Sequence, residues 1–117
     1  MSRVKHPSTR ILGITGERAA EAFLVSRGYR IVQRNLRLPG GEIDIVAIEG
    51  NVLVFIEVKL RRTGGFGPAL RAVDARKRAR LRGLAADYAQ IVAPTARFRF
   101  DVVAIDGNRL ALHRNAF

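Results

Sequence analysis

The feature that most constrains the fold is a pair of apolar segments, 41–49 and 52–59, joined by Gly50-Asn51. Two such residues between apolar runs are typical of a tight β-hairpin turn, because they tolerate a positive φ. Both faces of the two segments carry Val, Ile or Phe over most of their length. Strands that are apolar on both faces are usually covered on both sides, so the pattern predicts a central hairpin between two helical layers.

The two-residue turn also predicts the register of this hairpin. Opposed residues then carry numbers that sum to 101, which places Asp44 opposite Glu57. The same register places Glu42 opposite Lys59. Because side chains alternate along a strand, all four project from one face. Two carboxylates directly opposite each other repel, so the pattern predicts a cation held between Asp44 and Glu57.

The remaining elements follow from apolar periodicity and from Gly, Pro and capping residues. The predicted elements are a helix over 16–27 capped by Thr15, a strand over 29–37, the hairpin, a helix over 75–91 capped by Asp74, and strands over 96–106 and 109–114. This order is that of an α/β fold with an αβββαβ core, a central mixed sheet flanked by helices on both faces, and an extra C-terminal strand. Residues 1–14 are predicted to form a basic arm, and residues 15–117 a single domain.

The net charge of +11 favours a polyanionic partner, and nucleic acid is the commonest polyanion in a cell. A general preference for Arg with a solvated basic surface is the alternative. The absence of Cys excludes disulfides and thiolate metal sites, and two distant His residues argue against zinc. No apolar run is long enough to span a bilayer, so we expect a cytoplasmic protein without a membrane partner.

Basic side chains in three segments are candidates for contact with phosphates. A solvated basic surface is the alternative for the second helix. The candidates are Arg34 and Arg37 on the first strand, Arg61 and Arg62 in the Gly-rich loop that follows Lys59, and Arg76, Lys77 and Arg80 on the second helix.

The carboxylate pair suits the chemistry of phosphate esters. Mg²⁺ prefers oxygen ligands and is typically held by one or two carboxylates, here Asp44 and Glu57, plus water. Lys59 lies on the same face, where neighbouring carboxylates should favour its charged form and electrostatic stabilisation of the transition state. A buried salt-bridge cluster is the structural alternative, although burying three charges is costly.

Two further acidic residues are ambiguous from the sequence. Glu17 lies near the inner stripe of the first helix, where either a site role or the helix dipole accounts for it. Asp101 is predicted to pair with Arg114 across the last turn, because their numbers sum to 215, as do those of Ile105 and Leu110.

The pattern resembles the PD-(D/E)xK nuclease superfamily and, more closely, the YraN-type family of small bacterial proteins. The resemblance is carried by Gly16-Glu17-x-x-Ala20, Gly28-Tyr29, Arg34-Asn35-x-Arg37, Gly41-Glu42-Ile43-Asp44, Phe55-Ile56-Glu57-Val58-Lys59, Lys77, Arg99-Phe100-Asp101-Val102-Val103 and Asn115-Ala116-Phe117. Ile43 stands where the superfamily has the Pro that names it. The family is in turn similar to archaeal Holliday-junction resolvases, which implies a restriction-endonuclease-like fold and, by analogy, a homodimer.

The resemblance also implies roles for individual residues. Asp44, Glu57 and the backbone carbonyl of Val58 would bind Mg²⁺ or Mn²⁺. Lys59 would be catalytic together with both carboxylates, and Glu17 would position a metal-bound water. The predicted register, rather than the resemblance, suggests that Glu42 orients Lys59, which it would face.

The sequence thus predicts a metal-dependent endonuclease that hydrolyses phosphodiester bonds in DNA rather than RNA, including branched or damaged DNA. A non-catalytic nucleic-acid-binding protein on the same fold is the first alternative. A structural or partner-binding protein with incidental basicity is the second.

Overall fold

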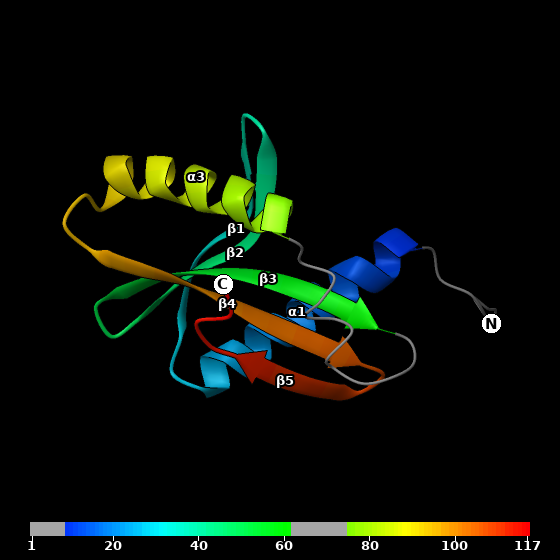
Figure 1. Cartoon of the computed structure of the whole chain (residues 1–117). Helices are drawn as coiled ribbons and strands as arrows, with labels where there is room; N and C mark the ends of the chain where they lie inside the picture. The colour runs from blue at the N-terminus through cyan, green and yellow to red at the C-terminus, as the bar shows by residue number, and fades with distance from the viewer. Residues whose placement is uncertain (1–8, 62–74) are drawn as a thin grey trace.

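The computed structural model describes residues 9–61 and 75–117, which form two helices and one five-stranded sheet (Figure 1). The elements are α1 (Thr9–Ser26), β1 (Arg30–Leu38), β2 (Gly41–Glu49), β3 (Val52–Arg61), α3 (Ala75–Val92), β4 (Arg97–Asp106) and β5 (Arg109–His113). The strand order is β1-β2-β3-β4-β5, with β3 and β4 parallel and the other neighbours antiparallel. The predicted α/β fold with a mixed sheet and an extra C-terminal strand is confirmed.

The two helices cover opposite faces of the sheet, and each encloses its own apolar core (Figure 1). The core beneath α3 consists of Leu36, Ile43, Val46, Leu53, Phe55, Leu81, Leu84, Ala85, Ala89 and Phe100. The core beneath α1 consists of Ala20, Leu24, Tyr29, Ile45, Ala47, Val54, Ile56, Val103 and Ile105. β2 and β3 contribute to both cores, as predicted from their two apolar faces. Among the described residues, neither helix combines the length and apolarity that crossing a membrane requires.

The central hairpin has the predicted register. Gly50 takes a φ of 62° in the turn, and the ladder runs from the pair Glu49–Val52 to the pair Ile45–Ile56. Each of these pairs sums to 101. The turn residues therefore set the pairing of the two innermost strands, as their sequence predicts.

Beyond Ile45 and Ile56 the sheet opens into two arms, and we call this opening the fork. Residues 41–44 of β2 pair only with β1, while residues 57–61 of β3 pair only with β4. The prediction that Glu42 lies across from Lys59 is therefore wrong. Glu42 is instead opposite Arg37 in the ladder between β1 and β2, because that hairpin diverges from β3.

The helix boundaries differ from prediction mainly at one end. α1 begins at Thr9, seven residues before the predicted start, so Thr15 lies inside the helix and does not cap it. It ends at Ser26, one residue before the predicted end, and the predicted stop residue Gly28 has a φ of 93°. α3 begins at Ala75 as predicted, and its proposed cap, Asp74, lies outside the described residues, as do residues 1–8.

Candidate functional site

Asp44 and Glu57 flank the origin of the fork, one on each diverging strand. Glu57 is buried and Asp44 is half-buried. Where the ladder ends, Val58 loses β2 as a backbone partner, and its N–H donates to Asp44 Oδ2 at 2.9 Å. The carboxylate of Asp44 thus replaces a missing carbonyl acceptor, which holds its side chain beside Glu57.

The electrostatic environments of the two carboxylates are opposite. Burial and then the charge of Glu57 raise the pKa of Asp44 to about 8, against a smaller lowering by the Val58 N–H. Burial would raise the pKa of Glu57 too, but the hydrogen bond and charge of Lys77, with the charge of Lys59, make the net direction downward. Glu57 is thus the charged member of the pair near neutral pH, and Asp44 retains a proton.

Two lysines converge on one oxygen of Glu57. Lys77 Nζ lies 2.5 Å and Lys59 Nζ lies 3.2 Å from Glu57 Oε2. Burial and the adjacent Lys77 lower the pKa of Lys59, which outweighs the attraction of Glu57. Glu57 does favour the charged form of Lys59, as expected, but burial and the second ammonium at the same site reverse the net direction of the pKa shift. The pKa of Lys77 is raised despite its burial, chiefly by its hydrogen bond to Glu57.

Glu17 reaches the same region from the opposite face of the sheet. Its pKa is raised by burial and then by the charge of Glu42, with a smaller contribution from Glu57, while a hydrogen bond with the Asn35 side chain opposes the shift. Because α1 begins at Thr9, Glu17 lies about two turns into the helix. The helix dipole acts within the first turn, so it does not account for this residue. The open fork lets side chains from both helices approach one position.

The predicted basic residues do not form one cluster. Arg34 Nε donates to both carboxylate oxygens of Glu21, at 2.9 and 2.8 Å. Arg37 Nε lies 3.6 Å from Glu42 Oε2 at an exposed position. The other candidates lie on α3, where Arg76 and Arg80 are exposed and Lys77 binds Glu57, while the side chain of Arg61 and the whole of Arg62 are outside the described region.

Asp101 has a different partner from the one predicted. It is fully buried and accepts hydrogen bonds from Tyr29 Oη at 2.6 Å, from Arg99 at 3.0 Å and from the Asn115 N–H at 2.8 Å. Arg114 instead pairs with Glu49. The register of β4 and β5 is as predicted, but Asp101 lies just beyond the ladder.

Arg99 links this buried carboxylate to the rest of a polar network. Its guanidinium donates to Asp101, to Tyr29 Oη at 2.9 Å and to Glu49 Oε1 at 2.6 Å. Burial and Asp101 raise the pKa of Tyr29 to about 12. The sequence did not predict this network, although Arg99 and Asp101 are two residues apart on one strand face. Every charge in it has a partner, so it is a structural cluster.

The donors at the fork are few and all oxygen. Within residues 9–61 and 75–117, no three His, Cys, Asp or Glu side chains form a ready metal cluster. Asp44 and Glu57 supply two adjacent carboxylates. Mg²⁺ commonly uses no more than that from a protein, together with waters and substrate oxygens, so the donor set fits a hard divalent cation.

Comparison with known proteins identifies the family. The model of the uncharacterised protein family UPF0102 matches residues 16–105, a span that includes Glu17, Asp44, Glu57 and Lys59. A UPF0102 protein of Moorella thermoacetica is 53% identical over 94 residues, covering 80% of this chain and 78% of the relative. A UPF0102 protein of Symbiobacterium thermophilum is 46% identical, and the match covers 93% of this chain and 98% of the relative. A UPF0102 protein of Shewanella loihica is 44% identical, and the match covers 90% of this chain and 92% of the relative. The chain therefore belongs to the UPF0102 family, the YraN-type family that its sequence resembles.

Proposed function

We propose that the fork is the centre of a metal-dependent endonuclease that hydrolyses phosphodiester bonds in DNA, including branched or damaged DNA. The observation that carries this proposal is the carboxylate pair where the sheet opens, with two lysines on the same group. Burial and the charge of Glu57 raise the pKa of Asp44 to about 8, and a bound cation would stabilise the two carboxylates in their charged forms. The PD-(D/E)xK resemblance assigns the same residues to that chemistry.

The proposed ligands for Mg²⁺ or Mn²⁺ are Asp44, Glu57 and the Val58 carbonyl. A hydrogen-bonded residue of an antiparallel ladder directs its N–H and C=O toward the same neighbour. Because the Val58 N–H points to Asp44, its carbonyl is expected at the same edge of β3. When bound, the ion would polarise the phosphate and lower the pKa of a coordinated water.

The neighbouring side chains supply the rest of the proposed mechanism. Lys59 and Lys77 carry positive charge at the fork, where negative charge develops on the phosphate during hydrolysis. The raised pKa of Glu17 brings this carboxylate closer to the range in which it can accept a proton from water. The net charge of +11 favours a polyanionic substrate.

The test is cleavage of end-labelled junction, flap and duplex DNA with Mg²⁺ or Mn²⁺. We expect cleavage that Lys59→Ala lowers by about 10² or more and that Asp44→Asn abolishes. Asp87→Asn removes a carboxylate from an exposed position on α3 and serves as the matched control, with cleavage unchanged. Cleavage that survives both substitutions at the fork would overturn the site assignment.

A second candidate is a non-catalytic nucleic-acid-binding protein on the same fold. The observation that favours it is that Lys59 and Lys77 already neutralise Glu57 without a metal. This function predicts salt-sensitive DNA binding with no metal-dependent turnover on any substrate of the panel. Product formation that requires a divalent ion and Asp44 would exclude it.

A further inference from the structure

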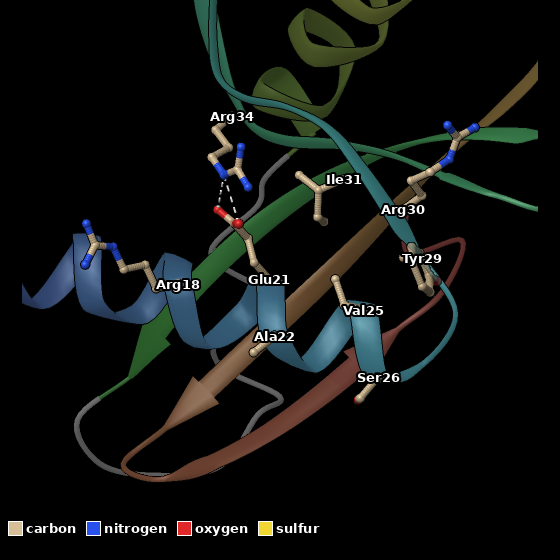
Figure 2. A pocket seen from close by; sticks show the side chains of 9 residues that line it. All are labelled: Arg18, Glu21, Ala22, Val25, Ser26, Tyr29, Arg30, Ile31 and Arg34. Carbon is tan, nitrogen blue, oxygen red and sulfur yellow. Dashed lines mark hydrogen bonds and ion pairs between the residues drawn. The ribbon is translucent and has the colours of Figure 1, made fainter.

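A groove between α1 and β1 lies outside the fork (Figure 2). Its volume is about 720 Å³, and it is widely open to solvent, so it suits a ligand that lies along the surface. Ala22, Val25 and Ile31 contribute apolar surface between the helix and the strand. The groove is therefore large enough to hold a ligand and combines apolar and charged walls.

The charged side chains of the groove favour an anion. Figure 2 shows Arg18 on α1 and Arg30 on β1, with the ion pair of Arg34 and Glu21 between them. Arg18 and Arg30 are exposed, and neither has an ion-pair partner among the residues described. Three arginines against one glutamate leave the lining positive, and Arg suits bidentate contact with phosphate.

The apolar surface favours nucleotides whose bases are unpaired. Val25 is 56% exposed, a high value for a large apolar side chain. A duplex presents mainly phosphates and sugars to a surface of this kind, whereas a single strand also presents the faces of its bases. A site built from both arginines and apolar side chains therefore fits a single strand better than a duplex backbone.

Two residues that line the groove are neighbours of residues near the fork. Glu21 lies one helical turn after Glu17 on α1, close enough for its charge to raise the Glu17 pKa. Arg34 directly precedes Asn35, whose side chain bonds to Glu17. One end of the groove therefore lies beside Glu17, on the side of the fork.

We propose that the groove between α1 and β1 binds unpaired nucleotides beside the cleavage site, so the preferred substrates carry a single-stranded segment. This inference rests on the proposed function in one respect, that the fork is the cleavage site. The binding itself is independent of cleavage. Arg18 and Arg30 contact phosphates, and Val25 contacts a base or sugar.

The test measures the anisotropy of a short labelled oligo(dT) and of a blunt duplex of equal length, in EDTA. We expect tighter binding of the oligonucleotide by the wild type. Arg18→Ala/Arg30→Ala should weaken it about tenfold and flatten the log–log salt dependence by about 1.4, the value for two phosphates of a single strand. Val25→Ser should weaken oligonucleotide binding while leaving duplex binding unchanged.

The matched control is Arg97→Ala/Arg109→Ala, which removes the same charge from the start of β4 and of β5. An equal loss in both double variants would overturn the groove assignment, as would a wild type that binds the duplex at least as tightly as the oligonucleotide. Because EDTA removes divalent ions, failure of the nuclease proposal leaves these results intact. If the protein cleaves DNA but binds the oligonucleotide equally well without Arg18 and Arg30, the groove assignment is wrong and the nuclease proposal stands.

Discussion

At the scale of single residues, the fork holds two adjacent carboxylates with opposite pKa shifts. Asp44 is half-buried beside a charged neighbour, and burial and that charge raise its pKa to about 8. Glu57 is more fully buried, yet Lys77 and Lys59 lower its pKa. The two pKa shifts therefore predict opposite effects on stability when each carboxylate is replaced by its amide.

Asp44→Asn should stabilise the protein at high pH. Asp44 binds its proton more tightly in the folded chain, so its favourable contribution is present below about pH 4 and is lost as the pH rises through about 8. Asn keeps an acceptor for the Val58 N–H but cannot ionise. Urea denaturation across pH should show the variant gaining on the wild type by up to about 1.4 kcal/mol per pH unit. A variant that is less stable than the wild type above pH 8 would contradict the assignment.

Glu57→Gln should destabilise the protein near neutral pH. It leaves Lys59 and Lys77 without their shared carboxylate, at a cost of about 1–3 kcal/mol. Because the pKa of Glu57 is lowered, its contribution is present above the usual pKa of a glutamate and disappears as the pH falls through its folded value. The same denaturation series should therefore show the two proteins converging in acid; a constant difference would count against this pairing.

Some of these residue-scale features are accessible from the sequence, and others are not. The Gly50-Asn51 turn sets the register up to the pair Ile45–Ile56, and Asp44 and Glu57 are the next residue on each strand, so the sequence predicts that they lie close together. The lowered pKa of Lys59 depends on Lys77, which arrives from another element with no fixed sequence spacing. The partner of Asp101 depends likewise on how Arg99 folds back along the strand face.

At the scale of elements, α3 packs against the tip of the hairpin formed by β1 and β2. A Cβ added at Gly41 would lie 2.9 Å from Leu84 Cδ1, and Leu84 belongs to the core beneath α3. A side chain at Gly41 would therefore force the end of the Leu84 side chain, which packs in that core, to move. This contact holds one arm of the fork against the helix that carries Lys77.

Gly41→Ala should loosen that arm, with a loss of about 1–3 kcal/mol from overpacking. The control is Gly83→Ala on α3, where an added Cβ meets nothing within 4 Å and helix propensity predicts a gain of about 0.5–1 kcal/mol. Thermal unfolding of the two variants should therefore shift in opposite directions. If Gly41→Ala is as stable as the wild type, Leu84 moves freely and does not fix the hairpin.

The element order and the two-sided burial could be predicted from periodicity, but the fork could not. Strict alternation along β2 puts Ile43 and Ile45 on one face. In the structure Ile43 joins the core beneath α3 and Ile45 the core beneath α1. The outer part of the hairpin has twisted away from β3 to pack on α3. That change results from tertiary packing, which a period-two pattern does not record.

At the scale of the whole molecule, the net charge of +11 surrounds a site made of acidic residues. The field attracts a polyanion to the protein, while the fork concentrates the negative groups that a cation would bind. The composition predicts the positive field of the whole molecule, but it does not predict which surfaces carry unpaired positive charge. The distribution of that charge depends on which basic side chains form ion pairs, as Arg34 does with Glu21.

DNA binding should depend steeply on salt if the basic candidates contact phosphates. The five candidates with described side chains are Arg34, Arg37, Arg76, Lys77 and Arg80. If all five engage a duplex, the slope of log K against log salt is about −4.5. Anisotropy titrations in EDTA at several salt concentrations measure it directly. A slope near zero would mean that these basic side chains do not contact the phosphates of nucleic acid.

The most direct test of the central claim is a calorimetric titration with Mn²⁺ near pH 8, because it does not depend on knowing the substrate. We expect one ion bound per wild-type chain, binding lost in Asp44→Asn and in Glu57→Gln, and binding retained in the surface control Asp87→Asn. Proton release on binding should accompany the ion, since Asp44 gives up its proton. A wild type that binds no Mn²⁺, or binds it equally well without Asp44 and Glu57, would contradict the account of the fork as a metal-dependent nuclease centre.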